Sequence, residues 1–251
     1  MVTETDNKER RQREHTVEAI DSRLTGRGSN SYLRDSILGG IDGAVTTFAV
    51  VAGSLGGGFT RDVAVTLGLA NLIADGFSMA VSNYQGTRSR QEEIERARSS
   101  ELDQVRVFPE GERAEIRRIF ERKGFRGDVL DTIVSTITGD LNRWVDTMMR
   151  EELGIERTQP DPRRAAVATF VAFILVGLLP LLPFFICDIT IETGFTWSVL
   201  ITAVTFFAIG AVKGVIVDKS LLSSGAGTLV TGAGAASIAY AVAHLLSTGV
   251  Q

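Results

Sequence analysis

Acidic and sulfur-containing side chains lie inside two stretches of this chain that are otherwise apolar. Asp42 is in the first stretch, residues 37–53, and Asp75 and Met79 are in the second, residues 67–81. A carboxylate at bilayer depth costs about 3 kcal/mol on insertion scales, so it indicates a function. A carboxylate binds protons or metal ions, and a thioether is a soft ligand that favours transition metals over Mg²⁺ and Ca²⁺. The three residues therefore suggest a path for a cation.

A second group of acids and methionines occurs in the charged middle of the chain. Glu112 and Glu115 are three residues apart, so they share one face of a helix. Met148 and Met149 precede Glu152 by four and three residues, so these also lie on one side of their helix. Acid pairs usually lie on a solvated surface, and methionines can fill a seam between helices. A mixed oxygen and sulfur site for a transition metal is the other interpretation.

The distribution of charge predicts how these residues are positioned. Of the 251 residues, 44% are hydrophobic and 22% are charged, and the charges concentrate in residues 1–36 and 85–164. This segregation predicts an all-α membrane protein with a cytosolic helical domain inserted between the second and third spans. The expected organisation is a cytosolic leader, spans 1 and 2, the inserted domain, and spans 3 to 5, over residues 1–34, 35–84, 85–164 and 165–251.

Five segments have the ~20 mostly apolar residues that a membrane-spanning helix needs. They are residues 35–57, 63–84, 165–187, 195–217 and 225–247. The leader contains seven Lys and Arg residues and the inserted domain sixteen, whereas the turn after the first span contains only Arg61. By the positive-inside rule, the N-terminus and the inserted domain are expected in the cytosol and the C-terminus outside. Pro180 and Pro183 are expected to kink or end the third span.

The inserted domain is expected to be a set of helices separated by proline and glycine. The second span is expected to continue as a charged helix to about Val105, before Pro109. Three shorter helices follow, over residues 110–123, 129–138 and 140–153. A domain of this size is small for an independent core, so support from a partner subunit or the membrane domain is expected.

The leader and the rare side chains exclude several classes of site. The leader has both signs of charge and no apolar run, so a solvated tail is expected and no signal peptide. An amphipathic helix over about residues 14–24 is the alternative. The single cysteine, Cys187, excludes an intrachain disulfide framework, and two histidines are too few for a zinc cluster.

Three strings resemble signatures of the vacuolar iron transporter family. DSILGGIDGAVTTFAVVAG (residues 35–53) looks like its first-helix signature, and LGLANLIADGFSMA (residues 67–80) looks like its second. TMMREELG (residues 147–154) resembles the end of its cytosolic metal-binding domain, and the resemblance covers about residues 32–249. It implies a homodimer with five spans per subunit that exports ferrous iron from the cytosol in exchange for protons.

The resemblance also implies roles for individual residues. Asp42 and Met79 match residues that face a translocation pathway at the dimer interface. One further glutamate of the family matches Gln104, which removes a charge, and the motif after Met79 reads Ser82-Asn83-Tyr84, without an acid. The positions that match metal ligands of the cytosolic domain are Glu101, Glu112, Glu115, Met148, Met149 and Glu152.

Several alternatives stay open. Asp75 is either a second pathway carboxylate or a packing acid paired with Lys213. Fe²⁺ is the expected substrate, with Mn²⁺, Co²⁺ and Zn²⁺ as alternatives, and no prosthetic group is expected. A manganese or broad transition-metal exporter would use the same ligands, and a membrane-anchored metal sensor would use only the cytosolic domain. Intramembrane acids argue against a sensor, because an anchor gains nothing from them.

Other partners and activities are not expected. The sequence has no serine–histidine arrangement, histidine ligand pair or nucleotide loop, so an enzyme is not expected, and neither is binding to nucleic acid. The expected surroundings are membrane lipid, in the cytoplasmic membrane of a prokaryote or the vacuolar membrane of a eukaryote.

Overall fold

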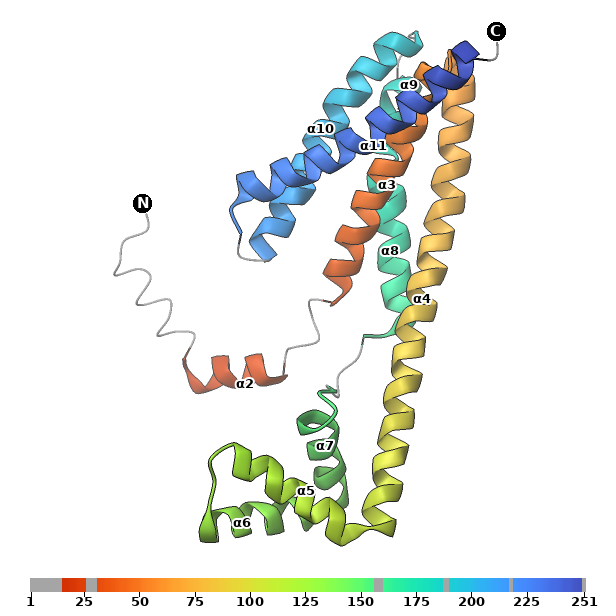
Figure 1. Cartoon of the computed structure of the whole chain (residues 1–251). Helices are drawn as coiled ribbons and strands as arrows, with labels where there is room; N and C mark the ends of the chain where they lie inside the picture. Colours follow the sequence, from red (N-terminus) through yellow and green to blue (C-terminus); the bar gives the residue numbers. More distant parts are fainter. Residues whose placement is uncertain (1–14, 26–30, 156–159, 187–189, 217–218, 250–251) are drawn as a thin grey trace, which may run out of the picture. The chain divides into compact units, whose positions relative to one another are not determined.

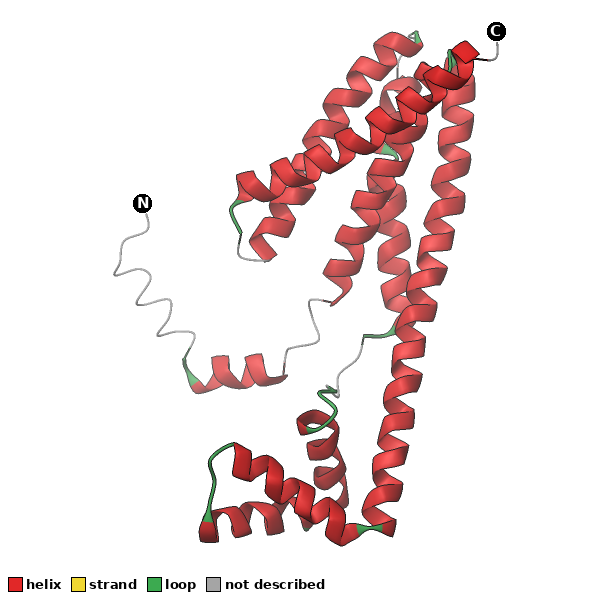
Figure 2. Ribbon diagram, in the orientation of Figure 1, coloured by secondary structure: helices red, strands yellow, loops and turns green. Residues whose placement is uncertain are grey.

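The structure is a computed structural model that describes residues 15–25, 31–155, 160–186, 190–216 and 219–249. All regular structure in these ranges is helical, and no strand occurs in them (Figure 2). Cys187 and the first 14 residues of the leader lie outside the described residues. The chain divides into two compact units. We call Met1–Gly28 with Gly86–Gln159 the charged unit, and Ser29–Gln85 with Pro160–Gln251 the apolar unit.

Five helices are long and apolar enough to cross a membrane, as the sequence predicts (Figure 1). They begin two to four residues before the predicted starts, because the helices include polar first-turn residues that hydropathy leaves out. For example, the Asp161 side chain accepts a hydrogen bond from the Arg164 backbone nitrogen at 2.9 Å and caps the third span. The helices concerned are α3 (Ser31–Gly56), α4 (Arg61–Val107), α8 (Pro162–Gly177) with its continuation, α10 (Ile191–Ile216) and α11 (Leu221–Gly249).

The helix α4 is much longer than a membrane is thick. Its 47 residues extend over roughly 70 Å at about 1.5 Å per residue, against about 30 Å for the hydrocarbon core of a bilayer. The predicted continuation of the second span as a charged helix is therefore confirmed. It ends at Val107, and α5 (Pro109–Arg122) begins with the proline.

Proline interrupts the third span, also as predicted. The helix α8 ends at Gly177, Pro180 lies in a 3₁₀ turn (Leu179–Leu181), and α9 (Leu182–Ile186) follows. The buried Ser198 hydroxyl of α10 donates a hydrogen bond to the Pro180 carbonyl at 2.7 Å. Irregular backbone at membrane depth is thus covered by a polar group of the protein.

Glycines allow α3 and α8 to approach at backbone distance. A Cβ atom on Gly39 would lie 2.5 Å from the Thr169 carbonyl oxygen, and one on Gly43 would overlap the Phe173 carbonyl oxygen. A Cβ on Gly177 would lie 2.8 Å from the Gly43 oxygen. Small residues at such spacing are typical of helix contacts in lipid. These glycines pack helices of one chain against each other.

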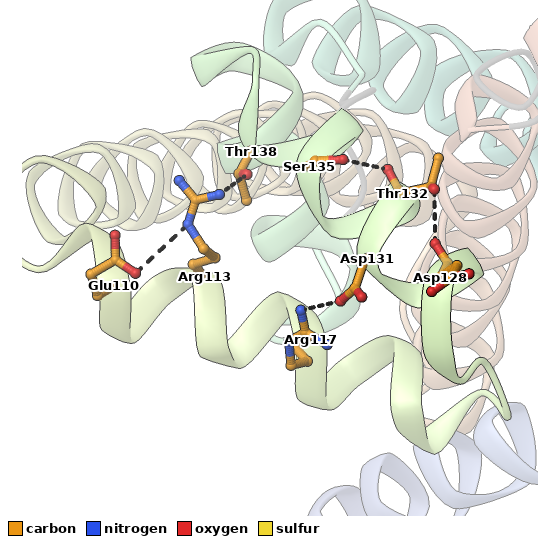
Figure 3. A network of polar contacts seen from close by, with 8 residues as sticks. All are labelled: Glu110, Arg113, Arg117, Asp128, Asp131, Thr132, Ser135 and Thr138. Atoms are coloured by element: carbon orange, nitrogen blue, oxygen red, sulfur yellow. Dashed lines mark hydrogen bonds and ion pairs between the residues drawn. The ribbon is translucent and has the colours of Figure 1, made fainter.

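The charged unit has its own apolar core. It contains α2 (Val17–Thr25), the second half of α4, α5, α6 (Gly127–Thr138) and α7 (Leu141–Glu151). Polar contacts fasten α5 to α6: Arg113 donates to the Thr138 hydroxyl at 2.9 Å, and Arg117 pairs with Asp131 (Figure 3). The buried core residues are Val105, Ile116, Leu130, Val134, Ile137, Trp144, Val145, Met148 and Met149.

The leader forms a helix where the alternative interpretation placed one. The helix α2 begins just after Thr16, whose hydroxyl accepts a hydrogen bond from the Ala19 backbone nitrogen at 3.3 Å. This contact is a typical N-terminal cap. The helical alternative is therefore correct for Val17–Thr25.

Substitution of Gly39 by alanine tests the close approach of α3 and α8. We expect Gly39→Ala to lower the free energy of unfolding by about 1–3 kcal/mol, because the added methyl group meets rigid backbone. Thermal unfolding of the full-length protein in detergent measures the effect. Gly234→Ala on α11 is the matched control, because nothing lies within 4 Å of its added Cβ. Equal midpoints for the two variants would contradict the packing argument.

Candidate functional site

Four glutamates from three helices come together in the charged unit. Glu101 lies on α4, Glu112 and Glu115 on α5, and Glu152 directly after α7. Their carboxylates are close enough to act on one another electrostatically. None of the four forms an ion pair with a described lysine, arginine or histidine. The result is a concentration of acidic groups that no base among the described residues pairs with.

Two of these glutamates are buried. Glu101 is 4% exposed and Glu112 is 5% exposed, whereas Glu115 and Glu152 are exposed. In each buried side chain the Oε2 atom has no hydrogen-bond partner among the described residues. An unsatisfied buried carboxylate oxygen is costly, so a structural role is a poor explanation for it. The expectation of a solvated acid pair is wrong for Glu112.

Helical spacing explains why these two carboxylates point inward. Glu112 precedes the fully buried Ile116 by four residues, and Glu101 precedes the buried Val105 by four. Residues four apart lie one above the other on the same helix face. Each glutamate therefore occupies a core-facing position that an apolar residue would usually fill.

Burial and like charge hold protons on the cluster. Burial, followed by the charges of Glu115, Glu101 and Glu152, raises the pKa of Glu112 to about 7. Partial burial and the charge of Glu115 raise the pKa of Glu152. A carboxyl group with a pKa near 7 exchanges its proton for another cation near neutral pH.

The two methionines are core residues beside this cluster. Met148 is fully buried and Met149 is 6% exposed, and both belong to the apolar core. The Glu152 backbone nitrogen donates to the Met148 carbonyl oxygen at 2.9 Å, so the glutamate directly follows the methionines at the helix end. Their contacts match the expectation that methionines fill a helix seam. Their role as metal ligands stays a prediction.

The cluster is not arranged as a closed metal site in this structure. Among the described residues, no three His, Cys, Asp or Glu side chains lie close enough together to hold a metal ion. When ionised and without a cation, these carboxylates repel one another, which opposes a closer arrangement. The Gln104 amide donates to Glu101 Oε1 at 3.4 Å. The position where the resemblance expects a glutamate therefore lies beside the cluster.

Polar contacts between helices hold the cluster in place. Arg98, three residues before Glu101, forms an ion pair with Asp146 of α7 and donates to the Asn142 side-chain oxygen at 3.3 Å. Lys123, just after α5, pairs with Glu151. These contacts connect the helices that provide the four glutamates.

The apolar unit brings two of the predicted pathway residues together. The carboxylates of Asp42 on α3 and Asp75 on α4 lie close enough to interact electrostatically, and both side chains are partly buried. Met79 is also partly buried and lies one helical turn after Asp75. No ion pair joins Asp75 to Lys213, two residues that the structure describes, and Lys213 is exposed. The packing alternative for Asp75 therefore lacks its expected partner.

A further acid of the same unit, Asp35, is not among the pathway residues predicted from the sequence. Asp35 accepts a hydrogen bond from the side chain of Asn83 on α4. The Asn83 amide also donates to the Thr169 hydroxyl at 2.7 Å and to the Ala165 carbonyl at 3.3 Å, both on α8. The sequence contains a sign of its position, because Asp35 precedes Asp42 by seven residues and so lies on the same face of α3.

The raised pKa of Glu112 predicts how pH affects the charged unit without metal. The folded state binds this proton with a pKa of about 7, against 4.5 for the ordinary group. The stability that this proton contributes is therefore fully present below the ordinary pKa. It is lost as the pH rises through the pKa of the folded state. Glu112→Gln is expected to reduce this dependence, leaving the part due to Glu101 and Glu152, and to stabilise the unit above pH ~7.

Fluorescence of Trp144 reports on this unit, because Trp144 belongs to its core. Chemical unfolding of the full-length protein with chelator, in a Trp197→Phe background, measures stability between about pH 5 and 8. Glu95→Gln, at an exposed position of α4, is the control and should leave the pH dependence unchanged. A pH dependence as steep in Glu112→Gln as in the unmodified protein would overturn the assignment.

Comparison with known proteins adds the family. The model of the VIT family matches residues 33–244. Vacuolar iron transporter 1 of Arabidopsis thaliana is 31% identical over 221 residues, which cover 87% of each chain. Vacuolar iron transporter 2 of Oryza sativa subsp. japonica is 30% identical over 251 residues, which cover 99% of this chain and 100% of that relative. The vacuolar iron transporter of Toxoplasma gondii is 30% identical over residues that cover 87% of this chain and 75% of that relative. The chain therefore belongs to the VIT family.

Proposed function

We propose that this protein moves a divalent transition-metal ion, first of all ferrous iron, out of the cytosol in exchange for protons. Its relatives are named as vacuolar iron transporters, which supports transport of a metal ion and a vacuolar membrane in a eukaryote. The observation that carries the proposal is the meeting of Asp42 and Asp75 within the spans. Two carboxylates at membrane depth need a cation, and an anchor would have no use for them.

The chemistry of two neighbouring carboxylates supports exchange. Two negative charges in a medium of low dielectric constant repel each other strongly, so the pair binds either protons or a divalent ion. A metal ion that arrives from one side displaces the protons, and protons that arrive from the other side displace the metal. Met79, one turn after Asp75, offers a thioether that favours Fe²⁺ over Mg²⁺ and Ca²⁺.

The charged unit is proposed to collect the ion on the cytosolic side. Its four glutamates form no ion pair with a described base, so their combined field attracts divalent cations. Binding of a metal would release the proton of Glu112, because a ligand carboxylate must be ionised. The metal would also offset the repulsion that keeps the carboxylates apart, and rotation of the side chains would close the site around it.

The second proposal for the charged unit is that it senses metal and does not supply it. The observation that favours this role is that the buried glutamates belong to a compact unit separate from the intramembrane acids. The two roles differ in their effect on transport, since a sensor can lose its ligands while the pathway still conducts metal. A homodimer with the pathway between subunits is proposed from the family resemblance.

Transport by the intramembrane acids can be measured in proteoliposomes. We expect Fe²⁺ uptake driven by a pH gradient, with Mn²⁺, Co²⁺ and Zn²⁺ compared in the same assay. Asp42→Asn should reduce uptake to the level of empty liposomes, because the neutral amide takes up no proton near neutral pH and is a much weaker ligand for a transition metal than a carboxylate. Asp62→Asn is the matched control, since Asp62 is an exposed aspartate in the first turn of α4. Uptake by Asp42→Asn equal to that of Asp62→Asn would refute the pathway.

Metal binding by the charged unit is tested by one substitution that removes a carboxylate and one that adds a carboxylate. Glu112→Gln is expected to weaken metal binding by roughly tenfold or more, because it removes a carboxylate that would contact the metal. Loss of such a ligand should cost more affinity than loss of a residue that only hydrogen-bonds to a ligand. Gln104→Glu should tighten it, because it adds a carboxylate beside Glu101. Calorimetric titration of the full-length protein with Fe²⁺ or Co²⁺ measures both.

Transport by the same variants separates the two roles of the charged unit. If it supplies metal to the pathway, Glu112→Gln should slow uptake at low metal concentration and leave uptake at saturating metal unchanged. Weakened binding with normal uptake at every concentration would identify a sensor. Unchanged binding in both variants would show that the glutamates are not ligands.

A further inference from the structure

An apolar groove lies on the outside of the apolar unit, where α3, α8 and α10 meet. It has a volume of about 850 Å³. Ile37, Val171, Leu175 and Ile209 are among the residues that form its walls. Because these helices are long and apolar enough to cross a membrane, a groove on their outside would open toward hydrocarbon and suit an acyl chain.

One end of this groove is cationic and polar. Arg163 and Arg164, in the first turn of α8, line it together with Tyr32 and Ser36 near the start of α3. Both arginines are exposed, and neither forms an ion pair with a described acid. Asp161, three residues before Arg164, accepts a hydrogen bond from the Arg164 backbone nitrogen as the cap of α8.

A second apolar groove lies on the other side of α8. It has a volume of about 370 Å³ and lies between α8 and α4, with Phe77, Tyr84 and Phe170 in its walls. Arg163 and Val167 line both grooves. The first turns of α8 thus place one guanidinium group between two apolar surfaces.

We propose that this region binds a phospholipid with an anionic headgroup, whose phosphate contacts Arg163 and Arg164 and whose acyl chains occupy the grooves. A guanidinium group recognises phosphate through paired hydrogen bonds in one plane. Apolar walls add affinity for the chains that a free phosphate ion cannot use. The combination of a cationic mouth and an apolar body fits an amphiphile.

A second copy of the chain fits this surface less well. A two-fold contact places the same surface patch of each subunit against the other. Over this mouth it would bring Arg163 and Arg164 toward the identical arginines of the partner, and the lining of the groove contains no acid to offset them. An anionic lipid in the same place would attract the arginines and bring no such repulsion.

Thermal unfolding of the full-length protein in a neutral detergent tests the proposal. We expect phosphatidylglycerol to raise the unfolding midpoint, and phosphatidylcholine with the same chains or glycerol phosphate to have little effect. Arg163→Gln with Arg164→Gln should abolish the shift. The matched control is Arg96→Gln with Arg106→Gln, which removes the same charge at exposed positions of α4 in the charged unit and should keep the shift.

A variant that leaves the arginines intact tests the groove itself. Val171 is exposed and lines the larger groove, so Val171→Trp should fill it and abolish the shift. Native mass spectrometry should show retained phosphatidylglycerol on the unmodified protein and its loss from both variants. Circular dichroism and the midpoint without lipid establish that each variant folds.

Four results would overturn the proposal. They are an equal shift with phosphatidylcholine, an equal shift with glycerol phosphate, a retained shift in the double arginine variant, and dissociation of a dimer by Val171→Trp. The last result would show that a second copy occupies the groove. Every readout is lipid binding or oligomeric state, so the outcome does not depend on whether the protein transports metal.

Discussion

Carboxylates held away from water without a compensating base are the constraint on which this structure depends. Glu101 and Glu112 are buried in the charged unit, and one oxygen of each has no partner among the described side chains. Asp42 and Asp75 form a second pair in the apolar unit, where both are partly buried. Each arrangement raises the free energy of the metal-free, ionised protein. A bound cation or proton lowers it, so these acids are suited to exchanging cations.

Such sites exist only if the rest of the fold holds them. In the charged unit, Ile116 and Val145 anchor the core around the glutamates, and the Arg98–Asp146 ion pair connects α4 to α7. In the apolar unit, Gly39 and Gly43 allow α3 to pack against the backbone of α8. Close packing of this kind has two consequences. It positions the acids, and it prevents them from relaxing into water.

Much of the fold could be predicted from local patterns, whereas the site could be predicted only in part. Pro109 and Gly154 mark helix boundaries whatever the tertiary structure around them. A proline cannot donate a backbone hydrogen bond, and a glycine accepts a positive φ angle, which is 65° at Gly154. Glu101, by contrast, is one of many charges on a charged helix, and only the family resemblance singled it out. Asp35 shares a face of α3 with Asp42, but its contact with Asn83 of another helix is visible only in the folded chain.

The sequence by itself determined an all-helical chain with five apolar spans and an inserted charged domain, because hydropathy and helix-breaking residues act locally. The tertiary structure alone decided which acids lose their water. It buried Glu112 and left Glu115 exposed, although the two share one helix and lie three residues apart. Desolvation of a side chain depends on residues from distant helices that pack over it. The four-residue spacing to Ile116 indicates on which side of α5 Glu112 lies, but only the packed helices show that this side is closed to water.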